Sequence, residues 1–215
     1  MLNPKDLLLY LCIDRVLALG RPIATAVEEA VAGGVTMVQL REKEASSREF
    51  YETALALRAL TRRLHVPLVI NDRLDIALAV CADGLHIGQS DLPLSAVRQL
   101  AGRDMLIGVS ASTVEEALDA ERNGADYLGV GAVYPTGSKA DAGAAIGLER
   151  LSEICAVVTI PVVGIGGVNG DNAGAVIKAG AAGIAVISGI LSQPDIKEAA
   201  RELRTIIHNV RRGEE

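Results

Sequence analysis

Short apolar runs alternate along the chain with longer segments whose apolar residues recur at helical spacing. Runs of this length, bounded by turn residues, are typical of buried strands. They predict eight strands, at residues 8–13, 37–40, 67–70, 85–87, 106–109, 127–130, 161–165 and 184–187.

The longer segments place their apolar residues on one side of a helix, as expected for helices that cover a core. Two of them begin with a capping box, Ser46-x-x-Glu49 and Thr113-x-x-Glu116, in which a hydroxyl and a glutamate satisfy the first backbone N–H groups. The pattern predicts helices at residues 23–32, 47–64, 73–80, 94–100, 114–123, 148–157, 172–179 and 195–210.

Strand and helix alternate without exception. Strands that are apolar throughout are buried on both faces, which requires a parallel sheet covered by helices. Eight such units in 215 residues predict an α/β protein with a closed (β/α)8 TIM barrel, formed by residues 1–215 as a single domain. An open, doubly wound sheet is the alternative.

Composition limits the function classes. The chain is 50% hydrophobic but 2% aromatic, so an aliphatic core is expected. The net charge is −6 and basic residues form no cluster, which argues against a nucleic-acid partner. The apolar runs are too short for a membrane span and the N-terminus lacks the pattern of a signal peptide. We therefore expect a cytoplasmic protein with no membrane partner.

Cysteine and histidine add little chemistry by themselves. Cys12, Cys81 and Cys155 are odd in number, lie far apart and form no metal-ligand spacing, so buried, reduced thiols are expected. His86 lies within a predicted strand, where a hydrogen-bonded interior histidine is the expected role. We assign it no part in catalysis.

Polar residues follow the predicted strands directly. In a barrel, the active site is built at the carboxyl ends of the strands, so these residues converge on one mouth. They lie at residues 39–43, 71–73, 88–91, 110 and 135–139. Glycine turns follow the last two strands, at residues 164–167 and 188–189, and their backbone N–H groups are suited to binding phosphate.

The charged residues of the mouth indicate a diphosphate bridged by a metal ion. Arg41 and Lys43 supply positive charge, and Asp72 and Asp91 supply carboxylates. Mg²⁺ takes one or two protein carboxylates and fills its other positions with water and phosphate oxygens, which this set matches. Two anion-binding regions at one mouth imply two phosphorylated, small-molecule substrates.

These residues resemble the thiamine phosphate synthase family. Seven motifs match in order: Gln-Leu-Arg-Glu-Lys at 39–43, Asn-Asp-Arg at 71–73, His-Ile-Gly-Gln at 86–89 with Asp91, Ile-Gly-Val-Ser at 107–110, Pro-Thr-Gly-Ser-Lys at 135–139, Gly-Ile-Gly-Gly at 164–167 and Val-Ile-Ser at 186–188. The resemblance implies a (β/α)8 transferase of thiamine biosynthesis. It would join hydroxymethylpyrimidine diphosphate to thiazole phosphate, or its carboxylate, and release diphosphate.

The resemblance also implies roles for single residues. The pyrimidine diphosphate would be held by Gln39, Arg41, Lys43, Asn71, Ser110 and Lys139, and the thiazole phosphate by Thr136, Ser138, Gly167, Ile187 and Ser188. Leu40, Glu42 and Gly137 belong to the same substrate-binding motifs. The metal ligands for Mg²⁺ would be Asp72 and Asp91, and the catalytic residues Arg41, Lys43, Ser110 and Lys139. Ser138 stands where the family usually has a second threonine, and it keeps the hydroxyl.

Plainer interpretations stay open. Asp72 and Asp91 precede predicted helices, where capping is the default role of an aspartate. Arg41, Lys43 and Lys139 have the alternative of being ordinary solvated charges. A non-coupling relative that binds thiazole phosphate, such as a thiazole tautomerase or a regulatory paralogue, is the first alternative function, although it would have no need of the diphosphate set. An unrelated phosphate-binding isomerase and a non-catalytic interaction protein are the others, and the sequence allows for a homo-oligomer.

Overall fold

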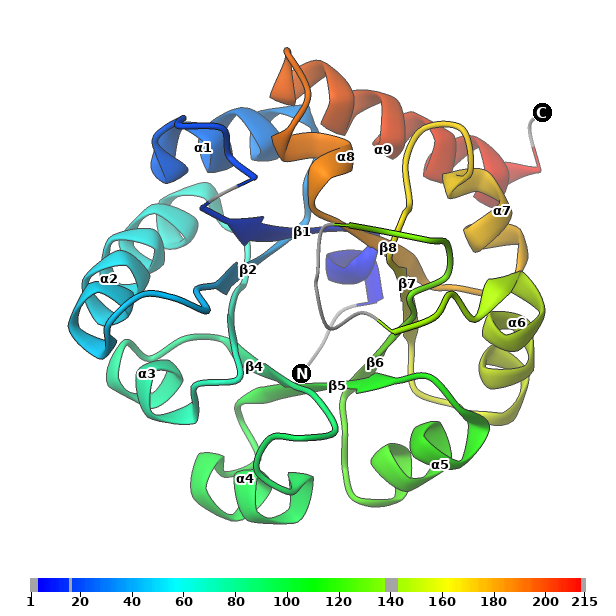
Figure 1. Cartoon of the computed structure of the whole chain (residues 1–215), viewed down its shortest axis with the longest axis horizontal. Helices are drawn as coiled ribbons and strands as arrows, with labels where there is room; N and C mark the ends of the chain where they lie inside the picture. The colour runs from blue at the N-terminus through cyan, green and yellow to red at the C-terminus, as the bar shows by residue number, and fades with distance from the viewer. Residues whose placement is uncertain (1–3, 16, 138–142, 214–215) are drawn as a thin grey trace.

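Eight parallel strands form a closed barrel in the order β1 to β8, and helices surround it (Figure 1). The computed structural model describes residues 4–15, 17–137 and 143–213. The strands are β1 (Leu9–Asp14), β2 (Met37–Arg41), β3 (Leu68–Asn71), β4 (Gly84–Ile87), β5 (Leu106–Ala111), β6 (Tyr127–Val130), β7 (Val162–Ile165) and β8 (Gly183–Val186). Because β8 pairs with β1, the barrel prediction is confirmed and the open sheet is excluded.

The helices follow the predicted pattern. They are α1 (Ile23–Gly33), α2 (Ser47–Leu64), α3 (Leu74–Ala79), α4 (Leu94–Ala101), α5 (Val114–Arg122), α6 (Gly147–Val157), α7 (Ala173–Lys178), α8 (Ser188–Leu191) and α9 (Ile196–Arg212). The sequence pattern does not predict α8 or the 3₁₀ helix η1 (Pro4–Leu7), because four residues are too few to show helical periodicity. Both predicted capping boxes are formed. None of the helices in the described ranges combines the length and apolarity needed to cross a bilayer.

Side chains of each strand alternate between two cores. Along β1, Leu9, Leu11 and Ile13 face outward into the large aliphatic layer between strands and helices. Tyr10 and Cys12 face inward and join a smaller cluster inside the barrel. This period of two decides which residues of each strand can reach the mouth.

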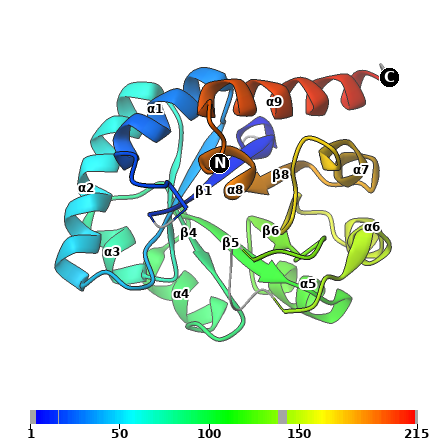
Figure 2. The same ribbon diagram turned by 45° about the horizontal axis from the view of Figure 1, so that its top comes forward.

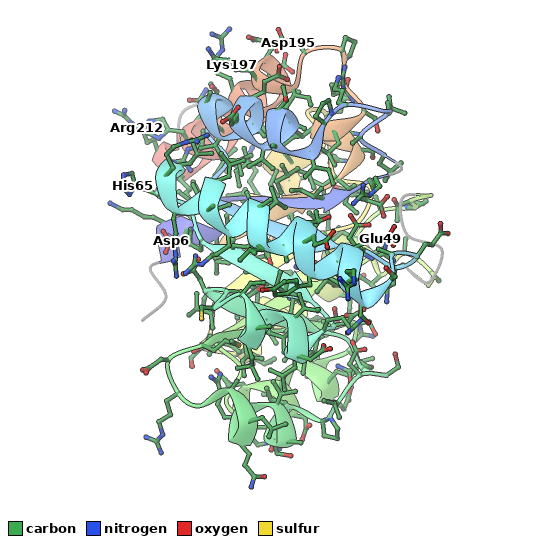
Figure 3. All side chains as sticks on the ribbon, turned by 90° about the vertical axis from the view of Figure 1, so that its left-hand side faces the viewer. Asp6, Glu49, His65, Asp195, Lys197 and Arg212 are labelled. Atoms are coloured by element: carbon green, nitrogen blue, oxygen red, sulfur yellow. The ribbon has the colours of Figure 1, made fainter. Side chains whose placement is uncertain are left out.

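The two ends of the barrel have different roles. Helix α2 runs from the end that carries Glu49 to the end that carries His65 and Asp6 (Figure 3). Since α2 begins after the carboxyl end of β2, Glu49 marks the mouth side. Leu7, the last residue of η1, is buried in the inner cluster at the opposite end, and η1 lies within the ring of strands in projection (Figure 1).

The last helix closes the outer layer. Helix α9 packs against α1 and α7, so elements from both ends of the chain lie side by side (Figure 2). Its buried residues Ala200, Leu203 and Ile207 recur at helical spacing along one face. Gly33 of α1 approaches the backbone of α9 so closely that a Cβ there would lie 2.3 Å from the carbonyl oxygen of Lys197.

The prediction that all three cysteines are buried is wrong for two of them. Cys12 is buried inside the barrel, Cys155 is half-buried and Cys81 is exposed. Cys81 lies just beyond α3, in a turn with φ 51°, so its side chain leaves the core. None of the cysteines, all of which lie in the described ranges, forms a disulfide.

Candidate active site

A cavity of about 730 Å³ opens at the carboxyl ends of the strands. It is the place where the side chains predicted from separate motifs meet. Its lining includes Gln39, Arg41, Lys43, Asn71, Asp72, Asp91, Ser110, Thr136, Gly167, Ile187 and Ser188. The chain positions of these residues span most of the sequence, and the barrel brings them together because every strand ends at the same face.

Three residues of the matched motifs lie away from this cavity. Leu40 alternates with Gln39 and Arg41, so its side chain points outward and is fully buried in the outer layer. Glu42 faces a separate hollow beside α2, where it accepts a hydrogen bond from Arg15. Gly137 is exposed and does not line the cavity. None of the three lines the cavity, so their assignment to substrate binding stays a prediction that the cavity lining does not support. Ser138 and Lys139 lie outside the described residues.

Arg41 is held at the mouth by an acidic neighbour. Its Nη1 lies 3.0 Å from Oδ2 of Asp14, which ends the adjacent strand β1, and the two residues are paired in the β1–β2 register. Both side chains are largely buried, with exposed fractions of 11% and 15%. A largely buried guanidinium needs such a partner, so Arg41 is not an ordinary solvated charge.

Asp72 and Asp91 come together from neighbouring loops. Lys43 donates to Asp72, with Nζ 2.6 Å from Oδ2, and the backbone N–H of Gly88 donates to Asp91 Oδ2 at 2.7 Å. Burial raises the pKa of Asp91, and the neighbouring carboxyl group of Asp72 adds to that effect. The two carboxyl groups therefore interact directly across the loops.

Neither aspartate is a helix cap. The residues at the N-cap positions of α3 and α4 are Arg73 and Pro93, and neither helix has a side-chain cap. Asp72 instead adopts φ 62°, a left-handed conformation that is uncommon for a residue with a Cβ. The capping interpretation is thus wrong for both, and the unusual backbone turns Asp72 toward the cavity.

The pair fits a hard divalent cation. No group of three or more His, Cys, Asp or Glu side chains that could hold a metal ion occurs among the described residues. The protein ligands available here would be the two carboxylates of Asp72 and Asp91. Mg²⁺ accepts such a partial set when substrate oxygens complete its shell. The ammonium group of Lys43 lies against the Asp72 carboxylate, so this carboxylate already pairs with one positive charge, as it would with a bound cation.

Glycine shapes the side of the cavity that follows β7. Gly167 has φ 65°, and a Cβ there would lie 2.7 Å from the backbone oxygen of Pro135 and 2.7 Å from Cβ of Tyr134. Only glycine therefore allows this turn to pass under the loop after β6. Ile187 and Ser188, which begin the short helix α8, line the cavity next to it. This arrangement is the usual phosphate-binding side of a TIM barrel.

A chain of buried polar groups crosses the floor of the cavity. Gln39 Nε2 donates to the Tyr10 hydroxyl at 2.7 Å, and Tyr10 and Tyr127 share a hydrogen bond of 2.9 Å. His86 Nδ1 lies 3.1 Å from the Tyr127 hydroxyl, and His86 Nε2 lies 3.0 Å from Ser110 Oγ. Burial raises the pKa of both tyrosines, so both stay protonated. The prediction of a hydrogen-bonded interior His86 is confirmed.

Two polar residues of the wall, Glu116 and Arg150, were not predicted, whereas Gln89 belongs to the stretch at 88–91 that was expected at the mouth. Gln89 donates to the backbone oxygen of Ser110 at 2.6 Å, and Glu116 Oε2 accepts from the backbone N–H of Ser112 at 2.7 Å. Arg150 of α6 adds a cation. Glu116 belongs to the capping box of α5, so its pattern indicated a structural role. Arg150 had no local signal, because helix α6 shows only the ordinary amphipathic pattern.

These features define a class of protein: a (β/α)8 barrel whose mouth unites a carboxylate pair, cationic side chains and a glycine turn after β7. Comparison with known proteins gives the family. The model of the thiamine monophosphate synthase family matches residues 9–190. The chain is 57% identical over 202 residues to the thiamine-phosphate synthase of Clostridium acetobutylicum, covering 94% of this chain and 95% of that protein. It is 54% identical over 203 residues to that of Moorella thermoacetica, covering 94% and 97%.

Solved structures agree with this result. The thiamine phosphate pyrophosphorylase of Pyrococcus furiosus superposes with a TM-score of 0.89 at 46% identity, over 96% of this chain and 98% of that one. The chain belongs to the thiamine monophosphate synthase family, and it is an enzyme of the transferase class. A geranylgeranylglyceryl phosphate synthase of Thermoplasma acidophilum, at 18% identity and a TM-score of 0.69, shares the fold.

Proposed function

We propose that this chain joins hydroxymethylpyrimidine diphosphate to thiazole phosphate to give thiamine phosphate and diphosphate. With the thiazole carboxylate as substrate, the carboxyl group would also leave, as CO2. The observation that carries the proposal is the meeting of Arg41, Lys43, Asp72 and Asp91 at one mouth, opposite the glycine turn at Gly167. Family membership supplies the substrate class. A barrel that only bound thiazole phosphate would not need the first group of residues.

The first step breaks the bond between the pyrimidine methylene carbon and the diphosphate oxygen. The electron pair leaves with diphosphate, so negative charge grows on the leaving group. Arg41 and Lys43, which line the cavity, would stabilise this charge more strongly in the transition state than in the ground state. Lys139, outside the described residues, is proposed to join them. Asp72 and Asp91 would hold Mg²⁺, which supplies further neutralisation of the diphosphate charge when bound.

The second step forms the new carbon–nitrogen bond. The thiazole nitrogen donates its electron pair to the methylene cation left by the first step, and the ring nitrogen becomes positively charged. The turn at Gly167, with Thr136, Ile187 and Ser188, would hold the thiazole phosphate and thereby position that nitrogen. No protein nucleophile is needed. Asn71, Gln39 and Ser110 would orient the pyrimidine diphosphate from the other side.

A coupling assay tests this function. Purified protein with both substrates and Mg²⁺ should give thiamine phosphate and diphosphate in equal amounts, and EDTA should stop the reaction. Titration of each substrate alone separates the alternatives, since a non-coupling relative would bind thiazole phosphate without Mg²⁺-dependent binding of the pyrimidine diphosphate. Binding of thiazole phosphate with no product would overturn the proposal.

A further inference from the structure

The polar chain on the cavity floor connects two residues that face the pyrimidine side of the site. Gln39 of β2 and Ser110 of β5 stand at its ends, and Tyr10, Tyr127 and His86 lie between them. Tyr10 and Tyr127 are almost fully buried, and His86 is 9% exposed. Groups buried to this degree must pair every donor with an acceptor, because an unpaired buried donor costs about 1–3 kcal/mol.

The Gln39 amide sets the direction of the chain. Its Nε2 can only donate, so the Tyr10 hydroxyl accepts that hydrogen bond and donates its own to the Tyr127 hydroxyl. Tyr127 then donates to His86 Nδ1, which must be the bare nitrogen of the ring. The proton of the neutral ring is therefore on Nε2.

The opposite direction leaves a donor without an acceptor. A proton on His86 Nδ1, whether the ring is neutral or charged, would make Tyr127 accept from His86 and donate to Tyr10. Tyr10 would then accept twice, from Tyr127 and Gln39, and its proton would find no acceptor among the described residues. The Nε2–H form of His86 satisfies every member of the chain.

Two glycines make room for this arrangement. A Cβ at Gly108, the β5 residue paired with His86, would lie 2.5 Å from His86 Nδ1 and 2.4 Å from the Tyr127 hydroxyl oxygen. A Cβ at Gly129 of β6 would lie 2.9 Å from Cε1 of the same ring. Because Gly108 and Gly129 present no side chain here, the imidazole has room, and its two nitrogens lie between Tyr127 and Ser110.

We propose that His86 is a positioning residue that makes Ser110 a hydrogen-bond donor to the pyrimidine substrate. His86 Nε2–H donates to Ser110 Oγ, and the hydroxyl proton of Ser110 is then directed into the cavity that Ser110 lines. At the other end, the same chain engages Gln39 Nε2 and leaves Oε1 as an acceptor for a substrate N–H group. The inference rests on the function proposed above, with the pyrimidine diphosphate as the ligand concerned.

A spectroscopic test needs no substrate. Protein labelled with ¹⁵N-histidine contains three histidines, and the exposed His65 and His208 serve as internal references. A multiple-bond ¹H–¹⁵N correlation spectrum should show His86 with its proton on Nε2, and Tyr127→Phe should shift the population toward the other tautomer. A proton on Nδ1 in the unaltered protein would overturn the proposal.

A kinetic test asks whether His86 acts through Ser110. His86→Gln retains an N–H group near the position of Nε2, whereas His86→Phe retains a ring without a donor. We expect His86→Phe to lower kcat/KM for the pyrimidine diphosphate by about tenfold, the equivalent of one hydrogen bond, and His86→Gln by less than about threefold. The KM for thiazole phosphate should not change. His208→Gln, at an exposed position, is the matched control.

The decisive comparison uses Ser110→Ala. In that background His86→Phe should cost less than about twofold, because the group through which it acts has gone. Equal losses in both backgrounds, or equal effects of the Phe and Gln variants, would overturn the proposal. If His86→Phe fails to fold, as thermal unfolding would reveal, Tyr127→Phe takes its place in the same cycle. If the unaltered protein does not couple the substrates, the proposed function is wrong, and so is the assignment of the pyrimidine diphosphate as the ligand of Ser110. The tautomer measurement would still report the state of His86.

Discussion

Lys43 and Asp72 form an ion pair across the loops that follow β2 and β3, with Nζ 2.6 Å from Oδ2. The Lys43 side chain is 46% exposed, so the pair adds little to stability. The ion pair matters for electrostatics, because Asp91 also approaches Asp72. The positive charge of Lys43 reduces the repulsion between these two carboxylates. The proposed site is therefore partly neutralised before any ligand binds.

The first prediction concerns this carboxylate pair. Asp72→Asn and Asp91→Asn should each lower turnover by at least about a hundredfold, since each removes a proposed ligand of Mg²⁺. Coupling rates measured over a titration of Mg²⁺ check this, together with loss of activity in EDTA. Asp75→Asn is the matched control, because Asp75, in the first turn of α3, pairs with Arg73 close to Asp72 in the chain and does not line the cavity. Unaltered rates for both variants at saturating Mg²⁺ would contradict the metal assignment.

The second prediction concerns the support of Arg41. Asp14→Asn removes the charge of its largely buried partner and should lower the free energy of unfolding by about 1–3 kcal/mol. The KM for the pyrimidine diphosphate should rise, because the guanidinium loses its fixed orientation, while that for thiazole phosphate stays unchanged. Denaturant unfolding and steady-state kinetics measure the two effects. Glu28→Gln, which breaks the exposed pair with Arg63, should change stability by no more than about 0.5 kcal/mol.

The third prediction compares two glycines of one loop. Gly167→Ala forces a Cβ onto a residue with φ 65° and against the backbone of Pro135, so it should destabilise the protein by about 1–3 kcal/mol and raise the KM for thiazole phosphate. Gly170→Ala places its Cβ in open space and should leave both quantities near their original values. Thermal unfolding and kinetics of the two variants decide the matter. Equal behaviour would remove the proposed role of the Gly167 turn.

The fourth prediction concerns thiol chemistry. Burial raises the pKa of the Cys155 thiol to about 11, so at pH 8 little of it is thiolate, and alkylation there should be slow. Cys81 is exposed and should react first, and the buried Cys12 last. Mass spectrometry of peptides after timed alkylation measures this order. Because the folded state keeps the Cys155 proton when the unfolded thiol has lost it, stability should fall as pH rises between about 9 and 11. Cys155→Ser should flatten that part of the stability curve.

Much of the fold was predictable from local pattern. Eight apolar runs and eight amphipathic segments correspond to β1–β8 and to the helices from α1 to α7 and α9. The capping boxes at Ser46 and Thr113 were readable because their hydrogen bonds span three residues. The two elements that were not predicted, η1 and α8, are single turns whose formation depends on the barrel against which they pack.

The candidate site was less predictable. The motif after β2 did not reveal that Leu40 and Glu42 turn away from the cavity, because that follows from the inward and outward alternation of the strand. The position of Asp72 before a helix left capping open as an alternative, and it was the backbone at φ 62° and the N-cap at Arg73 that excluded it. The position of Arg150 on the cavity wall depended on how α6 packs.

The sequence by itself determined the order of strands and helices, the parallel sheet and the set of polar residues at the strand ends, because each depends on periodicity or on neighbours in the chain. The tertiary structure alone decided which charges meet. Asp14 with Arg41, Lys43 with Asp72, and the hydrogen-bonded path from Gln39 to Ser110 all join different strands or loops. Such contacts arise only when the barrel closes and fixes the register between strands. The distance between two charges then determines how strongly they interact.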